Sequence, residues 1–69
     1  MNELETLRVL RVGVNEKQIE ALEAMVIASR EPDAAKRSEL VAKARKRWIQ
    51  LARERNAIDE QIERREDRQ

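Results

Sequence analysis

The sequence contains no cysteine, histidine, tyrosine or phenylalanine, and only one glycine, one proline and one tryptophan among 69 residues. Without cysteine there is no disulfide framework and no thiolate metal site. Without histidine there is no imidazole base or zinc ligand. Thr6, Ser29 and Ser38 therefore lack the base that would activate them as nucleophiles. These absences predict a protein that is not an enzyme, has no catalytic or metal site and uses no cofactor.

Long apolar segments are absent as well. No apolar run approaches the length that spans a membrane, and Glu3 and Glu5 make the N-terminus unlike a secretory signal. With one glycine and one proline, long loops are not expected. The sequence predicts a mainly helical cytoplasmic protein that does not enter a membrane.

Charge is abundant but unevenly placed. The chain has 15 basic and 14 acidic residues, so its net charge is only +1. Residues 36–55 carry eight basic against two acidic side chains, whereas residues 56–69 carry three basic against five acidic. The basic segment indicates a patch facing phosphates or an acidic protein surface. A solvated helix face is the alternative interpretation.

The small size of the chain bears on its oligomeric state. We expect a single domain over residues 1–69. Below roughly 70–80 residues one core seldom supplies more than about 3–5 kcal/mol. Because no disulfide or metal supplements that core, the sequence predicts an obligate homodimer.

A first helix is predicted to begin after Asn15. Asn15 and Gln18 have the spacing of a capping box, and Val14 and Ile19 that of a hydrophobic staple. Pro32 disfavours helix at the residue before it. These signals predict a helix over about residues 16–30.

A second, longer helix is predicted over about residues 34–65, with Asp33 as its cap. One stripe of this helix follows a 3-4 spacing like a coiled-coil seam, interrupted by the charged Arg55. A first helix of about 22 Å is too short to cover a second helix of about 48 Å, so part of the stripe is expected to need another chain. The stripe consists of Val41, Ala44, Trp48, Leu51, Arg55, Ile58 and Ile62.

Residues 2–14 fit two structures. Asn2 and Glu5 suit the start of a short helix that ends at Gly13. Against this, Leu10, Val12 and Val14 alternate with other residues as in a half-buried strand. A lone strand needs a partner, and a homodimer supplies one. We favour a strand over about residues 8–14.

Strand, capped helix, turn and helix form the plan of the ribbon-helix-helix family. Residues 10–19 resemble that family's strand leading into its first helix, and residues 36–44 resemble the start of its second. The resemblance implies a mainly α, intertwined homodimer whose paired strands enter the DNA major groove. Arg8 and Arg11 would then contact DNA. The implied dimer core is Leu10, Val12, Val14, Leu22, Val26, Val41, Leu51 and Ile58.

Two departures argue against ordinary DNA reading. Of the outward strand positions, only Arg11 can make a bidentate contact to guanine. The segment 30–35 between the helices is also longer than is usual in the family. An all-α helical-hairpin dimer that binds RNA is a further alternative, and it requires residues 2–12 to be helical.

A second resemblance concerns the basic segment. The small size, the lack of cysteine and histidine, and residues 45–49 in a long terminal helix are similar to small quorum-sensing anti-activators of Pseudomonas phages. This resemblance implies a phage protein in the host bacterial cytoplasm. It also implies binding to a LuxR-type transcription activator and to the type IV pilus assembly ATPase.

The contact surface expected for such a partner lies around the single tryptophan. Tryptophan and arginine are enriched at binding hot spots, and an apolar centre with a cationic rim is typical of an interface. We expect Arg45, Arg47, Trp48 and Ile49 to bind the partner protein. The pattern leaves open whether Trp48 is exposed or fills the core. The leading hypothesis is an inhibitor of a bacterial transcription activator, and the alternative is a DNA-binding repressor or antitoxin.

Overall fold

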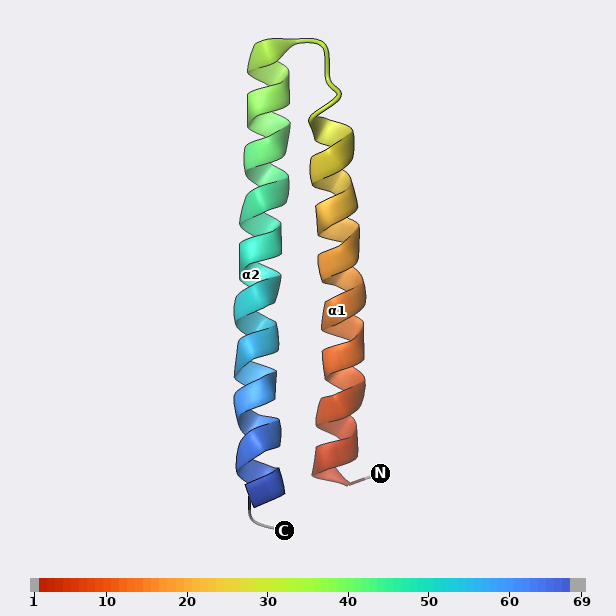
Figure 1. Ribbon diagram of the computed structural model, residues 1–69, viewed down its shortest axis with the longest axis vertical. Helices are drawn as coiled ribbons and strands as arrows, with labels where there is room; N and C mark the ends of the chain where they lie inside the picture. The colour runs from red at the N-terminus through yellow and green to blue at the C-terminus, as the bar shows by residue number, and fades with distance from the viewer. Residues whose placement is uncertain (1, 68–69) are drawn as a thin grey trace.

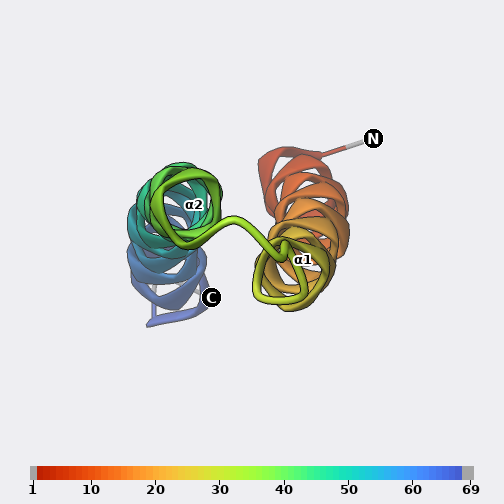
Figure 2. The same ribbon diagram turned by 90° about the horizontal axis from the view of Figure 1, so that it is seen from above.

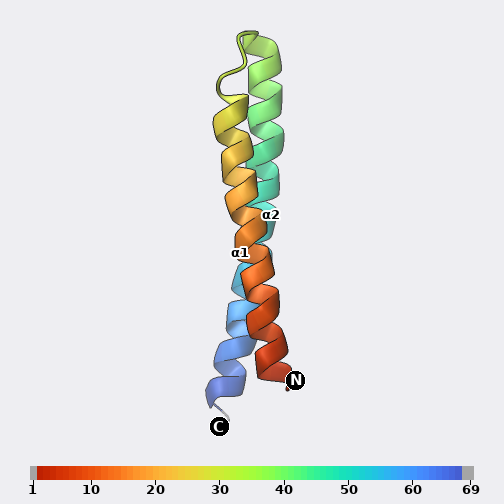
Figure 3. The same ribbon diagram turned by 90° about the vertical axis from the view of Figure 1, so that its right-hand side faces the viewer.

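The computed structural model describes residues 2–67 as two long antiparallel helices joined by a short turn (Figure 1). Helix α1 covers Glu3–Ala28 and helix α2 covers Ala34–Asp67. The start of α1 and the end of α2 lie together at the end of the hairpin opposite the turn. The two helices cross gently when seen from the side (Figure 3).

The ribbon-helix-helix prediction is wrong. Within residues 2–67 there is no strand, and the segment 8–14 belongs to α1. The fold fits the all-α helical-hairpin alternative, and a DNA-reading ribbon is excluded with the strand. Helix α1 therefore begins 13 residues before the predicted start at residue 16.

The true N-cap of α1 is Asn2, whose side chain accepts a hydrogen bond from the Glu5 amide at 2.9 Å. Glu3 and Glu5 in the first turn complement the positive end of the helix dipole. Asn15, predicted as the cap, lies in mid-helix, so the capping-box interpretation is wrong. The short helix considered for residues 2–13 was correct at its start, but it continues through Gly13.

Packing against α2 explains why the valine-rich segment is helical. Each β-branched residue disfavours helix by only a few tenths of a kcal/mol relative to leucine. A stripe at 3-4 spacing along the whole of α1 faces α2, and burial of this stripe outweighs those small penalties. The stripe consists of Leu4, Leu7, Arg11, Val14, Gln18, Ala21, Met25 and Ala28. Arg11 is its exposed member and contacts α2 through an ion pair with Asp59.

Gly13 has an ordinary helical conformation, because no residue of the described chain has a positive φ. A Cβ built at this position meets nothing within 4 Å. We expect Gly13→Ala to raise the free energy of unfolding by about 0.5–1 kcal/mol, since alanine restricts the unfolded chain and favours helix. The shift in the urea unfolding midpoint at fixed protein concentration measures this change in the free energy of unfolding. A lower midpoint would contradict a helical residue 13.

The turn between the helices is held by local hydrogen bonds. The amides of Arg30 and Glu31 each donate to a carbonyl three residues earlier, at 3.1 Å. Asp33 caps α2 as predicted, because its side chain accepts from the Lys36 amide at 2.9 Å. The Arg37 guanidinium donates to the Glu31 carbonyl at 3.2 Å, which ties the turn to α2.

The stripe predicted on α2 faces α1. Leu51 and Ile62 are buried, and Val41, Ala44, Arg55 and Ile58 are half-buried, whereas Trp48 retains 36% exposure. Since α1 starts at Glu3, it runs beside nearly all of this stripe in the same chain (Figure 1). The inference that a short first helix leaves the stripe uncovered is therefore wrong.

The core is thin. Leu4, Leu7 and Ile62 form one buried cluster near the chain ends, with Ile58 packed against it. Ala21, Ala28 and Leu51 are the other buried apolar residues in the described chain. The Cα trace extends over 54 × 16 × 11 Å, so the two helices lie side by side in a single layer. The end-on view shows this single layer (Figure 2).

Candidate protein-binding surface

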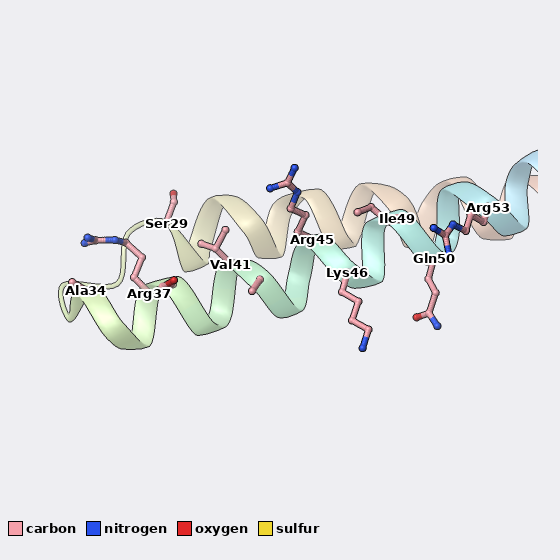
Figure 4. Close-up of a pocket in the computed structure, with 11 residues that line it drawn as sticks. Ser29, Ala34, Arg37, Val41, Arg45, Lys46, Ile49, Gln50 and Arg53 are labelled. Carbon is pink, nitrogen blue, oxygen red and sulfur yellow. The ribbon is translucent and has the colours of Figure 1, made fainter.

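A row of alternating arginine and apolar residues runs along α2. Arg37, Val41, Arg45, Ile49 and Arg53 follow one another at four-residue spacing, which places them on one ridge of the helix. Ala34, Ser38, Ala42, Lys46 and Gln50 form the neighbouring ridge with the same spacing. A shallow groove lies between these rows, and Ser29 closes its end at the turn (Figure 4). We call it the basic groove.

The basic groove combines an apolar floor with a cationic rim. Val41, Ala42 and Ile49 supply apolar surface, and Ile49 is 39% exposed. Arg45 and Lys46 project from the two rows to different sides of the floor (Figure 4). The groove contains no acidic lining residue. Its chemistry favours an acidic partner that also presents apolar side chains.

The structure separates the four predicted contact residues. Arg45 and Ile49 both line the basic groove. Trp48 lies instead in a hollow against α1, beside Ile19 and Leu22. Arg47 lines a third hollow, with Lys43 and the apolar side chains of Ala24, Ile27, Ala28, Leu40 and Ala44. A single patch of Arg45, Arg47, Trp48 and Ile49 is therefore not formed on one copy.

Arg8 and Arg11 lie on α1 and not on a strand, and each is held in an ion pair with α2. Arg8 pairs with Glu66 at 3.1 Å, and Arg11 pairs with Asp59 at 2.9 Å. These exposed ion pairs link α1 to α2 near the chain ends, each contributing about 0–1 kcal/mol. The two arginines were predicted to contact DNA from a strand, and that prediction fails with the strand.

The residues predicted for a dimer core fall into two groups. Leu51 is buried, and Val14, Val41 and Ile58 are half-buried inside the hairpin itself. Leu10, Val12, Leu22 and Val26 are between 49% and 56% exposed. Pairing of Leu10, Val12 and Val14 as a strand across a dimer axis is wrong, because all three lie on α1.

We did not predict from the sequence that Val41 and Arg53 lie in one row with Arg45 and Ile49. The sequence placed Val41 in the predicted dimer core, and Arg53 among the basic residues around Ile49. The four-residue spacing of residues 37, 41, 45, 49 and 53 predicts that these residues share one side of a helix. We also did not predict that Leu40 and Ile27 line a hollow with Arg47. These two residues lie on different helices, and only the packing of α1 against α2 brings them together.

In residues 2–67, no group of three or more Asp or Glu side chains is placed to hold a metal ion. No helix of that described part is both long enough and apolar enough to cross a membrane. No protein-family model, curated protein or solved structure matches the chain. The resemblance to phage anti-activators therefore stays a prediction from the sequence.

Proposed function

We propose that this protein is a small homodimeric regulator that binds another protein through the basic groove and inhibits a bacterial transcription activator. The ladder of Arg37, Val41, Arg45, Ile49 and Arg53 is the single observation that carries the proposal. It offers charge for steering and apolar surface for affinity on one accessible side of α2.

The shape of the basic groove suits a helix of the partner. Helices pack by placing the side-chain ridge of one into the groove between ridges of the other. Two parallel rows at four-residue spacing form such a groove along α2. A partner helix with acidic side chains would meet Arg45 and Lys46, while its apolar side chains would cover Ile49.

The partner class follows from the resemblance to phage anti-activators. A LuxR-type activator in the bacterial cytoplasm is the first candidate, and the pilus assembly ATPase is a second. A chain of this size without an activated nucleophile inhibits by occupying a surface that the activator needs for DNA binding. Inhibition therefore depends on affinity and stoichiometry, since each bound copy blocks one site.

The homodimer is supported by the thinness of the hairpin. Stable domains usually bury their apolar faces between two packed layers. Here a single layer of two helices leaves ten large apolar side chains of residues 2–67 at least 36% exposed. A second copy would add the missing layer.

The partner-binding test compares two matched double variants. We expect Arg45→Ala with Ile49→Ala to weaken binding to a purified LuxR-type activator about 100-fold, as two hot-spot residues lose roughly tenfold each. The control is Arg47→Ala with Leu40→Ala, on the other side of α2, where Leu40 is 38% exposed. It should bind nearly normally. Titration calorimetry measures affinity, and DNA-binding anisotropy of the activator measures inhibition.

Equal loss in both variants would contradict the basic groove as the contact surface. Binding lost only in the control would assign the contact to the hollow around Arg47. Circular dichroism of each variant checks that the helices remain, since all four side chains are exposed.

RNA binding is a second candidate, favoured by one observation. The helical-hairpin alternative requires residues 2–12 to be helical, and residues 3–12 lie within α1. A basic groove also attracts phosphates. Binding of labelled RNA across a salt series distinguishes it, because phosphate contacts weaken steeply with salt.

A further inference from the structure

An apolar surface distinct from the basic groove runs along α1. Val12, Ile19 and Val26 are seven residues apart and therefore share one side of the helix. Ile19 and Leu22 line a hollow together with Trp48 of α2. We call the five side chains of Val12, Ile19, Leu22, Val26 and Trp48 the open face. Each is between 36% and 58% exposed.

We infer that a second copy of this chain covers the open face and closes the hairpin into an antiparallel four-helix bundle. The inference rests on the homodimer proposed above and names its contact surface, its orientation and its central polar layer.

The exposed area of the chain supports this occupant. A compact monomer of 8.1 kDa exposes about 4,500 Å². This chain exposes 5614 Å², an excess of about 1,100 Å². A standard specific interface removes about 800 Å² from each partner. Pairing along one face of the hairpin therefore accounts for the excess on the scale of a stable dimer.

Polar side chains interrupt the open face near the middle of the hairpin. Asn15, Gln18 and Arg55 line the same hollow as Ile19, Leu22 and Trp48. The Arg55 Nε is buried and has no hydrogen-bond partner within the described chain. Asn15 of a second copy would bring a side-chain carbonyl to this layer. One asparagine in an apolar seam is a known means of fixing register and partner number.

The net charges of the two halves of the hairpin favour one orientation of the second copy, acting over a distance because most of these basic side chains lie outside the open face. The half of the hairpin next to the turn, residues 20–50, has seven basic and five acidic side chains. The described remainder, residues 2–19 and 51–67, has seven basic and nine acidic side chains. Placing the two turns at opposite ends of the bundle puts the basic half of each copy beside the acidic half of the other.

This arrangement also places apolar side chains of one copy opposite apolar side chains of the other. Asn15 lies close to the midpoint of α1, which spans Glu3–Ala28. A two-fold axis there brings Val12 of each copy opposite Ile19 of the other. Ile49, Lys46 and Arg53 lie in the basic groove and not on the open face, so both surfaces can be occupied together.

The contact-surface test uses two aspartate variants of α1. Sedimentation equilibrium of the wild-type chain should give the dimer mass, and its melting temperature should rise with protein concentration. Leu22→Asp should give the monomer mass with a melting temperature lowered or lost. Ile27→Asp is the matched control, because Ile27 is 69% exposed and lines the hollow around Arg47 instead. It should remain dimeric.

The outcomes separate this inference from the proposed function. A wild-type chain that is monomeric, with a melting temperature independent of concentration, overturns both the homodimer and the open face as its contact. A dimer that survives Leu22→Asp but not Ile27→Asp keeps the homodimer and overturns the open face. Loss of activator binding in the basic-groove variants is measured separately and does not depend on either result.

Orientation has its own measurement. A spin label at Ala35→Cys, near the start of α2, should report an intermolecular distance of roughly 55 Å when the turns lie at opposite ends, from the helical rise to the central axis. A distance of roughly 20 Å would place the turns at the same end, on the scale of two adjacent helix diameters, and would overturn the proposed orientation.

Discussion

Replacing Leu51 by alanine is expected to lower the free energy of unfolding by about 2–5 kcal/mol, the range for removing a buried leucine side chain. Leu51 is 6% exposed and is one of only six buried apolar residues in the described chain. Within one copy, residues 2–67 form a single layer of two helices, so that copy has no second core layer to close over the cavity. Urea unfolding followed by circular dichroism, at fixed protein concentration, measures the loss.

Leu40→Ala is the matched control for Leu51→Ala. Leu40 lies on the same helix but is 38% exposed, so its truncation should change the free energy of unfolding by less than about 1 kcal/mol. If Leu51→Ala and Leu40→Ala lowered the free energy of unfolding equally, the α2 stripe would not be what holds the two helices together.

Replacing Gly13 by proline is expected to lower the free energy of unfolding by about 3 kcal/mol or more. Proline in mid-helix removes a backbone hydrogen bond and places its ring against the carbonyl four residues earlier. Gly13 lies in the middle of α1, so the break would separate the two ends of the helix. Circular dichroism at 222 nm should fall together with the unfolding midpoint.

Ala34→Pro is the control for Gly13→Pro. Ala34 is the first residue of α2, directly after the Asp33 cap. The first helical position tolerates proline, because its amide has no intrahelical partner. The free energies of unfolding of the two variants should therefore differ by at least about 2 kcal/mol. A harmless proline at residue 13 would place that residue outside a helix.

Local signals predicted α2 well. Asp33 was expected to cap it, and the Asp33 side chain does so. The stripe from Val41 to Ile62 was expected from spacing alone, and Leu51 and Ile62 are its buried members. These features depend on hydrogen bonds within one helical turn and on a 3.6-residue period. Both can be recognised from residues that are close in sequence.

The candidate site was predicted only in part. Arg45 and Ile49 were expected to act together, and they do line one groove. Trp48 and Arg47 are adjacent to them in sequence, yet each lies in a different hollow. Closeness in sequence does not show which of these residues share a surface. That depends on which side of α2 packs against α1.

The sequence by itself determined that this protein lacks the groups for imidazole or thiolate chemistry, that it is mainly helical, and where α2 begins and which stripe it buries. Only the tertiary structure decided residues 2–14. There Leu10, Val12 and Val14 satisfy a strand pattern, while Leu4, Leu7, Arg11 and Val14 satisfy a helix pattern. Both patterns are locally acceptable, and the burial of Leu4 and Leu7 against Ile62 favours the helix.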